Sequence, residues 1–194
     1  MNSAPRTNKE LRTTITADDE LALSIINIKL PIPTTNQIIV RIETTPINPS
    51  DLALLLGPAD LTTARRDGDR LLAKVPAERL PLVKARLDQA LPVGSEGAGT
   101  VVDAGEGARA LVGKRVALAP GGTYAQFRIA RAFECMVLPD DVTAAQGASA
   151  TVNPLTALSM IEVLRSEGHT ALVHTAAASN LGQMLVRVCA ADKV

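Results

Sequence analysis

Residues 171–190 contain a turn whose residue types suit the binding of a phosphate. Residues 171–173 form a short apolar run, residues 176–179 are all small, and residues 181–188 carry leucine and valine at helical spacing. The pattern predicts a buried strand, a tight turn and a helix. Unpaired backbone N–H groups and the positive end of the helix dipole meet at such a turn and favour an anion. We therefore expect it to bind a phosphate, such as the pyrophosphate of a dinucleotide.

The turn matches only part of the glycine fingerprint G-x-G-x-x-G. Ala177, Ser179 and Gly182 occupy the three glycine positions. Gly182 permits close packing of the helix on the strand, and the other two residues are small enough for close backbone approach if their φ angles are negative. Any strand–turn–helix unit with an alanine-rich turn explains the pattern equally well, because short motifs often match by chance.

A second group of polar residues lies in the sequence PINPSD at residues 46–51. Two prolines restrict its backbone, and Asn48, Ser50 and Asp51 offer polar groups. Ser50 or Asp51 is also the expected N-cap of a helix that covers the following apolar residues. The loop is therefore predicted to be ordered, and its polar groups are candidates for a site.

Few other residues are suited to acid–base chemistry. Asp51 and Glu96 are candidate acids, but a buried carboxylate that accepts backbone N–H groups is the ordinary explanation for such residues. Tyr124 is the only tyrosine of the chain. His174 ends the predicted strand at residues 171–173, where we expect it to pack in the core.

Composition excludes several classes of function. The 194 residues include 20 basic and 20 acidic side chains, interspersed, with a formal net charge of zero. This balance disfavours nucleic-acid binding and a polybasic membrane anchor. The N-terminus lacks the apolar core of a secretory signal, and no apolar run is long enough to span a bilayer. We expect a cytoplasmic protein.

The two cysteines give no sign of a metal site or a disulfide. Cys135 and Cys189 are isolated, and neither has a nearby Cys or His at metal-ligand spacing. We predict two buried free thiols.

The elements that position the candidate residues begin with strands. Residues 21–30 and 37–45 carry alternating or β-branched apolar residues around a proline-rich turn, which predicts an antiparallel pair. Residues 1–14 are predicted to form a disordered tail. Residues 94–108, with their glycines, and the short apolar runs up to residue 130 predict a small β-barrel with glycine at its corners rather than a nucleotide loop.

Helical patterns occupy two other parts of the chain. Residues 58–92 are predicted to form a helical insertion, one face of which would carry Leu80, Val83, Leu87 and Leu91. The sequence from residue 143 to 164 is predicted to be helical on both sides of Pro154.

Five segments together resemble the medium-chain dehydrogenase/reductase superfamily, and they follow one another in that family's order. They are INPSD at 47–51, GSEGAGTVVDAG at 94–105, GGTYAQF at 121–127, NPLTAL at 153–158 and AAASNLG at 176–182. They look most like the zinc-free branch of quinone oxidoreductases and 2-enoyl-thioester reductases.

The resemblance implies a mixed α and β fold in two parts. Residues 1–145 would form a GroES-like β-barrel catalytic domain, with the insertion at about 58–92. Residues 146–194 would hold linking helices and the first βα unit of a Rossmann nucleotide-binding domain. Because relatives continue through five more strands, the chain is expected to be the N-terminal portion of a longer protein. Alone, it is expected to bind the cofactor poorly and to be inactive.

No metal is expected. Zinc-dependent relatives place a Cys in the loop that here reads Asn48-Pro49-Ser50, and a His in the corner where this chain has Ser95. The soft thiolate and the imidazole that bind zinc are therefore replaced, and the four-cysteine structural lobe is missing from this sequence.

The implied reaction is hydride transfer from a reduced nicotinamide to a quinone or to the polarised double bond of an α,β-unsaturated carbonyl compound or enoyl thioester. NADPH is the expected cofactor, and NADH is not excluded, because the strand that discriminates between them lies outside this sequence. A homodimer acting on a small molecule is expected, without nucleic acid or membrane. The alternative is a non-catalytic nucleotide-binding or structural member of the same superfamily.

The resemblance also assigns site residues. Asn48 would lie beside the nicotinamide and the acceptor. Tyr124 is the catalytic candidate, although a structural aromatic is the usual role at its position. Enoyl-thioester reductases use a tyrosine shortly after the loop, and this chain has none there. The other implied cofactor contacts are Asn153, Thr156, Ala177, Ala178, Ser179, Asn180, Leu181 and Gly182.

Overall fold

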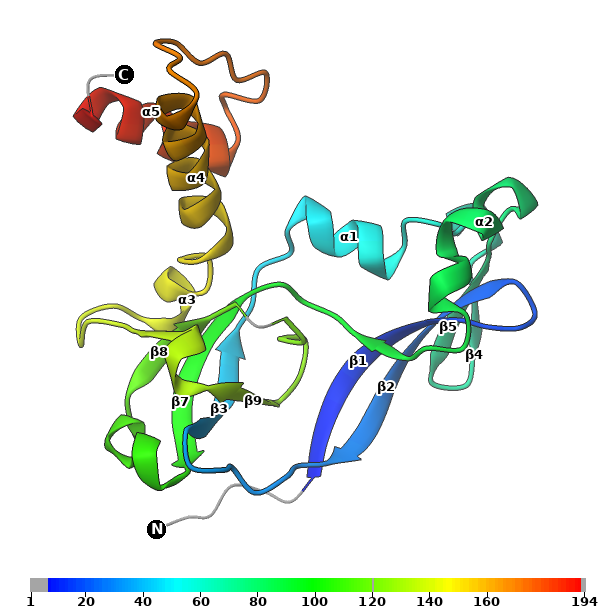
Figure 1. Cartoon of the computed structure of the whole chain (residues 1–194). Coiled ribbons are helices and arrows are strands. Elements are labelled where there is room, and N and C mark those ends of the chain that lie inside the picture. Colours follow the sequence, from blue (N-terminus) through cyan, green and yellow to red (C-terminus); the bar gives the residue numbers. More distant parts are fainter. Residues whose placement is uncertain (1–6, 120, 193–194) are drawn as a thin grey trace.

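Two antiparallel sheets of five strands each, with helices beyond one end, form the molecule (Figure 1). The computed structural model of the chain describes residues 7–119 and 121–192. Within that part of the chain, no helix is long and apolar enough to cross a membrane.

The first sheet has the strand order β4-β5-β2-β1-β6, and the second has the order β10-β8-β7-β3-β9. The strands of the first sheet are β1 (Thr7–Ile15), β2 (Glu20–Lys29), β4 (Arg65–Asp67), β5 (Arg70–Lys74) and β6 (Leu91–Pro92). Those of the second are β3 (Gln37–Thr44), β7 (Gly97–Ala104), β8 (Arg115–Leu118), β9 (Phe127–Arg131) and β10 (Cys135–Val137). The helices are α1 (Pro49–Leu55), α2 (Leu80–Val83), α3 (Ala144–Gly147), α4 (Val152–Ser166) and α5 (Asn180–Asp192). Short 3-10 turns lie at Leu61–Thr63, Ala77–Arg79, Lys84–Arg86, Glu106–Leu111 and Ala132–Glu134.

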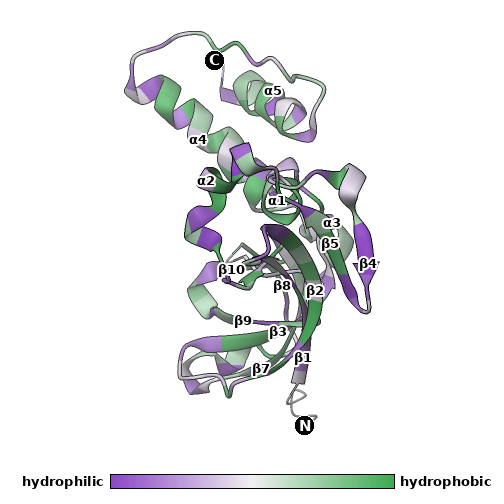
Figure 2. Ribbon diagram, turned by 90° about the vertical axis from the view of Figure 1, so that its right-hand side faces the viewer, coloured by the Kyte–Doolittle hydropathy of each residue, from purple (hydrophilic) through white to green (hydrophobic). Residues whose placement is uncertain are grey.

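Aliphatic side chains fill the second sheet's core, as the near-absence of aromatic residues requires. Ile38 and Val40 of β3, Val101 of β7, and Val116 and Leu118 of β8 are all buried there. The most hydrophilic strand, β4, lies at an edge of the first sheet, where its side chains face water (Figure 2).

The two sheets are joined by polar contacts of the first strand. Asn8 is 2% exposed, its amide nitrogen donates to the carbonyl oxygen of Phe127 at 2.8 Å, and its amide oxygen accepts the Phe127 N–H at 2.9 Å. Backbone bonds between Leu11 and Tyr124 and between Gln126 and Lys9 continue the contact. Residues 7–14 are therefore a paired strand, and the prediction of a disordered tail over residues 1–14 is wrong there. Residues 1–6 lie outside the described residues.

The predicted pairing of residues 21–30 with residues 37–45 is also wrong. β2 pairs with β1 and β5, whereas β3 pairs with β7 and β9. The tight reversal occurs earlier, where Asp19 has a φ of 58° between β1 and β2. The prolines of the later connection favour an extended backbone, so the chain crosses to the second sheet there instead of turning back.

The expected helical insertion at residues 58–92 is helical only in part. Its first half contains the hairpin of β4 and β5, whose turn has Gly68 at a φ of 58°. Asp67 and Gly68 favour a hairpin turn, and this preference prevails over the helical spacing of the apolar residues. Of the expected face, Val83 is buried and Leu80 packs against the same core cluster. Leu87 is 44% exposed, and the remaining residue, Leu91, lies in β6 instead.

The predicted strand at residues 171–173 is not formed. These residues make no sheet pairing with any described strand, and Val173 is 92% exposed. A buried parallel strand needs neighbouring strands on both sides, and none of the described strands lies beside this segment. His174 is half-buried rather than packed in a core, and its Nδ1 accepts the N–H of Ala176 at 3.2 Å.

The helix predicted after the strand is present, and it packs on the helix before it. Ala157 and Ile161 of α4 and Leu185 of α5 form a buried apolar cluster. Pro154 lies in the first turn of α4, where no intrahelical N–H is needed, so the helix is continuous through it. α3 is the separate, short helix before it.

The two cysteines are free, as expected, but half-buried rather than fully buried. Burial raises the pKa of the Cys135 thiol to about 11, with a further contribution from the negative charge of Glu134. This thiol is protonated at neutral pH and is therefore a poor nucleophile.

Candidate functional site

Asn48 lies at the start of α1, in the loop that follows β3. It is the N-cap of the helix, with an extended backbone, and Pro49 occupies the first helical position. Proline favours that position and forces the residue before it to be extended. The predicted N-cap at Ser50 or Asp51 is therefore wrong. Asp51 instead lies in the first turn, where its Oδ2 accepts the Asn48 backbone N–H at 2.8 Å.

Asp51 links this loop to two other segments. The residue is 3% exposed, and its carboxylate accepts the Ser95 hydroxyl at 2.5 Å and the Tyr124 hydroxyl at 3.3 Å. The Tyr124 hydroxyl also lies 3.0 Å from the carbonyl oxygen of Pro46, which accepts from it. Burial raises the pKa of Tyr124 to about 12, with the negative charge of Asp51 as the second cause. Tyr124 and Asp51 thereby restrain the backbone of the Asn48 loop, at Pro46 and at Asn48 respectively.

Glu96 is fully buried, and its two carboxylate oxygens bind different parts of the molecule. Oε1 accepts the side-chain amide of Asn48 at 3.0 Å. Oε2 accepts the backbone N–H groups of Thr151 at 3.1 Å and Val152 at 2.8 Å, and the Thr151 hydroxyl at 2.7 Å. The ordinary explanation for this residue, a buried carboxylate bonded to backbone N–H groups, is confirmed. The N–H groups belong to the start of α4, where the helix dipole favours a negative charge.

The backbone at Glu96 is fixed by hydroxyl groups. Its carbonyl oxygen accepts from Thr45 at 2.6 Å and from Thr123 at 2.8 Å. Two residues earlier, Gly94 has a φ of 92°, and a Cβ there would lie 2.5 Å from Thr123 Oγ1 and 2.5 Å from Tyr124 Cδ1. Only glycine fits this corner, which confirms that the glycines around residue 94 serve a structural corner.

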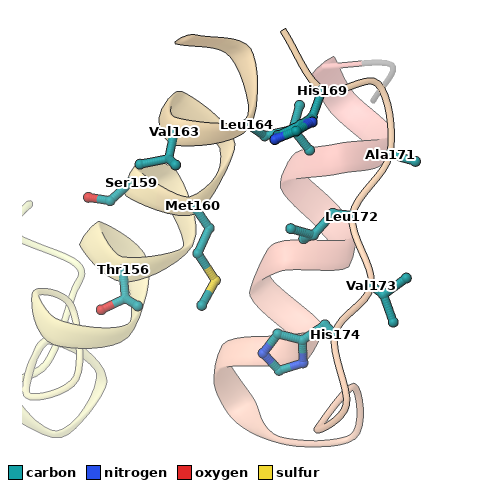
Figure 3. Close-up of a pocket in the computed structure, with 10 residues that line it drawn as sticks. All are labelled: Thr156, Ser159, Met160, Val163, Leu164, His169, Ala171, Leu172, Val173 and His174. Carbon is teal, nitrogen blue, oxygen red and sulfur yellow. The ribbon is translucent and has the colours of Figure 1, made fainter. Parts of the chain in front are cut away.

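Two predicted cofactor residues lie on α4, directly after the Glu96 contact. Asn153 follows Val152 and is half-buried, and the Thr156 hydroxyl donates to the Val152 carbonyl oxygen at 2.7 Å. Thr156 also lines a cavity of about 380 Å³. Met160, Leu172 and His174 border this mostly apolar cavity, between α4 and the extended segment before α5 (Figure 3).

The turn at residues 177–182 has the features of an anion-binding helix start. The Ser179 hydroxyl accepts the N–H of Gly182 at 3.0 Å and donates to the carbonyl oxygen of Ala176 at 2.7 Å. A Cβ on Gly182 would lie 2.5 Å from the Ala176 oxygen, so the turn needs glycine at that position. Residues 177–180 are exposed.

The turn is exposed to solvent, so a ligand can approach its backbone. Ala177 and Ala178 are exposed and precede α5, which begins at Asn180. Exposed N–H groups at a helix N-terminus are the donor set that a pyrophosphate needs. The residues present therefore fit a dinucleotide.

The structure brings some of the predicted site residues together. Asn48 and Tyr124 share Asp51 as a partner, and Asn48 reaches the start of α4 through Glu96. The turn at 177–182 makes no hydrogen bond to these residues among those described. It is connected to them through the packing of α5 on α4, above the sheets (Figure 1).

Ser95 and Thr151 as members of this network, and Glu96 as its bridge, were not predicted from the sequence. A signal was present for Glu96, because it is a carboxylate in a segment of otherwise small and apolar residues, and such a charge must find partners when buried. Among the described residues, no three or more His, Cys, Asp or Glu side chains lie close enough together to hold a metal ion.

The sequence pattern of the alcohol dehydrogenase GroES-like domain matches residues 34–152. A putative NADPH:quinone reductase from Mesorhizobium loti is 29% identical, with a TM-score of 0.68, over 99% of this chain and 54% of its own.

A mycobacterial protein solved in complex with NADPH is 25% identical, with a TM-score of 0.59, over 94% of this chain and 49% of its own. The enoyl reductase CurK, at 18% identity and a TM-score of 0.65, shares the fold over 95% of this chain and 51% of its own. The chain thus spans about half the length of the structures that it matches.

Proposed function

The chain belongs to the family of the alcohol dehydrogenase GroES-like domain, and from this premise we propose that its protein is a zinc-independent NAD(P)H-dependent oxidoreductase. The family match confirms the resemblance to medium-chain dehydrogenases/reductases and the GroES-like, mixed α and β fold. The proposed acceptor is a quinone or an α,β-unsaturated carbonyl compound or enoyl thioester. The neighbours support this class, because one is a putative NADPH:quinone reductase and another is an enoyl reductase.

The observation that carries the proposal is the fixed position of Asn48. Its backbone N–H is bound by Asp51 and its side-chain amide by Glu96, so neither the loop nor the side chain is free to rotate. Pre-organised polar groups contribute most to catalysis where charge develops in the reaction. We propose that the remaining polar atoms of this amide contact the nicotinamide and the carbonyl oxygen of the acceptor.

The cofactor, when bound, supplies the hydride. We propose that the turn at residues 177–182 holds its pyrophosphate through backbone N–H groups, and that Asn153 and Thr156 contact it along α4. NADPH is the proposed cofactor, supported by the mycobacterial neighbour solved with NADPH, and NADH stays the alternative. Asn48 and Ser95 replace the Cys and His of zinc-dependent relatives, which supports chemistry without zinc.

A catalytic role for Tyr124 stays a prediction, and its contacts favour another role. Its hydroxyl donates to Pro46 and Asp51, and its pKa of about 12 makes it a weak acid at neutral pH. We propose that Tyr124 is a positioning residue that holds the Asn48 loop. The predictions that the full protein is a cytoplasmic homodimer remain proposals as well.

The test uses the full-length protein that contains this chain. Oxidation of NADPH and NADH is followed with quinones and with a crotonyl thioester as acceptors. Steady turnover that is strongly reduced in Asn48→Ala supports the proposal. The matched control is Asn27→Ala, an exposed asparagine of β2. Tight cofactor binding without turnover on any acceptor would instead favour a non-catalytic nucleotide-binding member of the family.

A further inference from the structure

We propose that Glu96 couples the position of α4 to the orientation of the Asn48 side chain. This inference rests on the proposed function, since the coupling affects catalysis only if Asn48 contacts the nicotinamide and the acceptor. Glu96 is then a positioning residue, and among the described residues its carboxylate hydrogen-bonds both the loop before α1 and the start of α4, the helix leading toward the proposed nucleotide-binding turn.

The different partners of the two oxygens are the first observation. Oε1 binds only Asn48, at 3.0 Å, whereas Oε2 accepts three hydrogens from Thr151 and Val152. The carboxylate is rigid and planar, so a displacement of one oxygen displaces the other. A shift of the α4 start must therefore move the amide of Asn48 or break one of these bonds.

The second observation is that the backbone of Glu96 is fixed to the barrel by hydrogen bonds. Thr45 and Thr123 both donate to its carbonyl oxygen, and their own hydroxyl oxygens lie 3.0 Å apart. The backbone cannot follow α4 when the helix moves, so the motion is taken up by the side chain. Among the described residues, Glu96 forms no salt bridge, so its buried charge depends entirely on these neutral donors.

The third observation is the continuous packing between Glu96 and the predicted nucleotide-binding turn. α5 begins at Asn180, within that turn, and packs on α4 through Leu185 against Ala157 and Ile161. Packed side chains and rigid helices can carry energetic coupling between two sites. If a dinucleotide orders the turn, the resulting shift of α5 would be transmitted along α4 to Thr151 and then through Glu96 to Asn48.

The variant Glu96→Gln tests this path. Every partner of the carboxylate is a donor here, so the amide nitrogen of glutamine must face a donor on one of its two sides and lose that contact. The other side remains bound. The control is Glu43→Gln, a carboxylate on the exposed side of β3 that contacts Thr100 and Arg41.

The main measurement is amide hydrogen exchange in the full-length protein, in a cycle of Asn48→Ala with and without Glu96→Gln. When Glu96 is intact, Asn48→Ala should accelerate exchange of the Thr151 and Val152 amides, because the freed carboxylate can rotate. In the Glu96→Gln protein, the same change should have no further effect. Additive effects in the two backgrounds would overturn the coupling. If Glu96→Gln does not fold, the same cycle is run with Thr151→Val, and Thr151→Ser should restore the wild-type behaviour.

The kinetic measurement separates this inference from the proposed function. Glu96→Gln should lower kcat by about 10- to 100-fold, the loss expected when a reacting group is misplaced by about 1 Å. A stable Glu96→Gln protein with wild-type kcat would contradict the positioning role. If the wild-type protein oxidises no cofactor, the proposed function fails, and the exchange cycle still decides the coupling by itself.

Discussion

Asn48 and Glu96 lie 48 positions apart in the sequence and are joined by a 3.0 Å hydrogen bond that is buried at both ends. The bond brings an amide side chain from the start of α1 against a carboxylate from the corner before β7. The same carboxylate holds the first N–H groups of α4. A residue of the proposed catalytic loop and the start of the helix toward the proposed nucleotide-binding turn thus share one partner.

Loss of the Asn48 side chain is expected to reduce stability as well as activity. Asn48→Ala leaves Glu96 Oε1 buried without its donor, which typically costs about 1–3 kcal/mol of unfolding free energy. Chemical denaturation of the wild type and the variant measures the cost. An unchanged denaturation midpoint would mean that water or another donor replaces the amide.

Tyr124 predicts a pH dependence of stability at the alkaline end. Its pKa is raised from 10.0 to about 12 in the folded state, so between these values the folded protein binds more protons than the unfolded chain. The tyrosine contribution to the unfolding free energy is therefore full below pH 10 and declines as the pH rises toward 12. In Tyr124→Phe that decline should be absent. Equal pH slopes in the two proteins, measured by thermal unfolding, would contradict the raised pKa.

The Gly94 corner is expected to tolerate no side chain. Gly94→Ala combines a φ of 92° with contacts of 2.5 Å to Thr123 and Tyr124. Gly113 has a similar φ of 84° with nothing near its Cβ position, so Gly113→Ala is the matched control and should cost only about 1–2 kcal/mol. Gly94→Ala should be clearly less stable than this control in denaturant. Similar costs for the two would mean that the corner can relax.

The sequence predicted the local chemistry of the site better than its long-range contacts. The polar loop at residues 46–51 and the small-residue turn at 177–182 are where the spacing placed them, because prolines, small residues and helix-start signals act over a few residues. The link between Asn48 and Thr151 through Glu96 depends on tertiary packing, which the spacing of residues along the sequence does not indicate.

Strand pairing was the main failure of the sequence analysis. Alternation of residues shows that 21–30 and 37–45 are strands but says nothing about partners, which are set here by the hairpin at Asp19 and by the polar contacts of Asn8. The first strand was missed because its inward residues include Asn8, Glu10 and Thr13, which hide the period of two.

The 194-residue chain alone is expected to bind NADPH weakly. The segment that contains Leu172 and Val173 pairs with none of the described strands, and the adjacent cavity of about 380 Å³ is mostly apolar. A turn held by one helix pair is less rigid than one held at the edge of a sheet. Because the turn must be ordered when NADPH binds, the cost of that ordering reduces the affinity for NADPH. Titration of NADPH against the purified chain tests this expectation, and micromolar affinity would contradict it.

Gly182 is expected to control cofactor binding with little effect on the barrel. In Gly182→Ala the new Cβ would lie 2.5 Å from the oxygen of Ala176 and 2.6 Å from that of Ala177, so the turn must open and its N–H groups must turn away from a phosphate. Gly168→Ala is the control, because Gly168 has a φ of 74° and nothing within 4 Å of its Cβ position. The dissociation constant of NADPH for the full-length protein should rise in Gly182→Ala and not in the control. Equal affinities in the two variants, with both folded, would show that the pyrophosphate binds elsewhere.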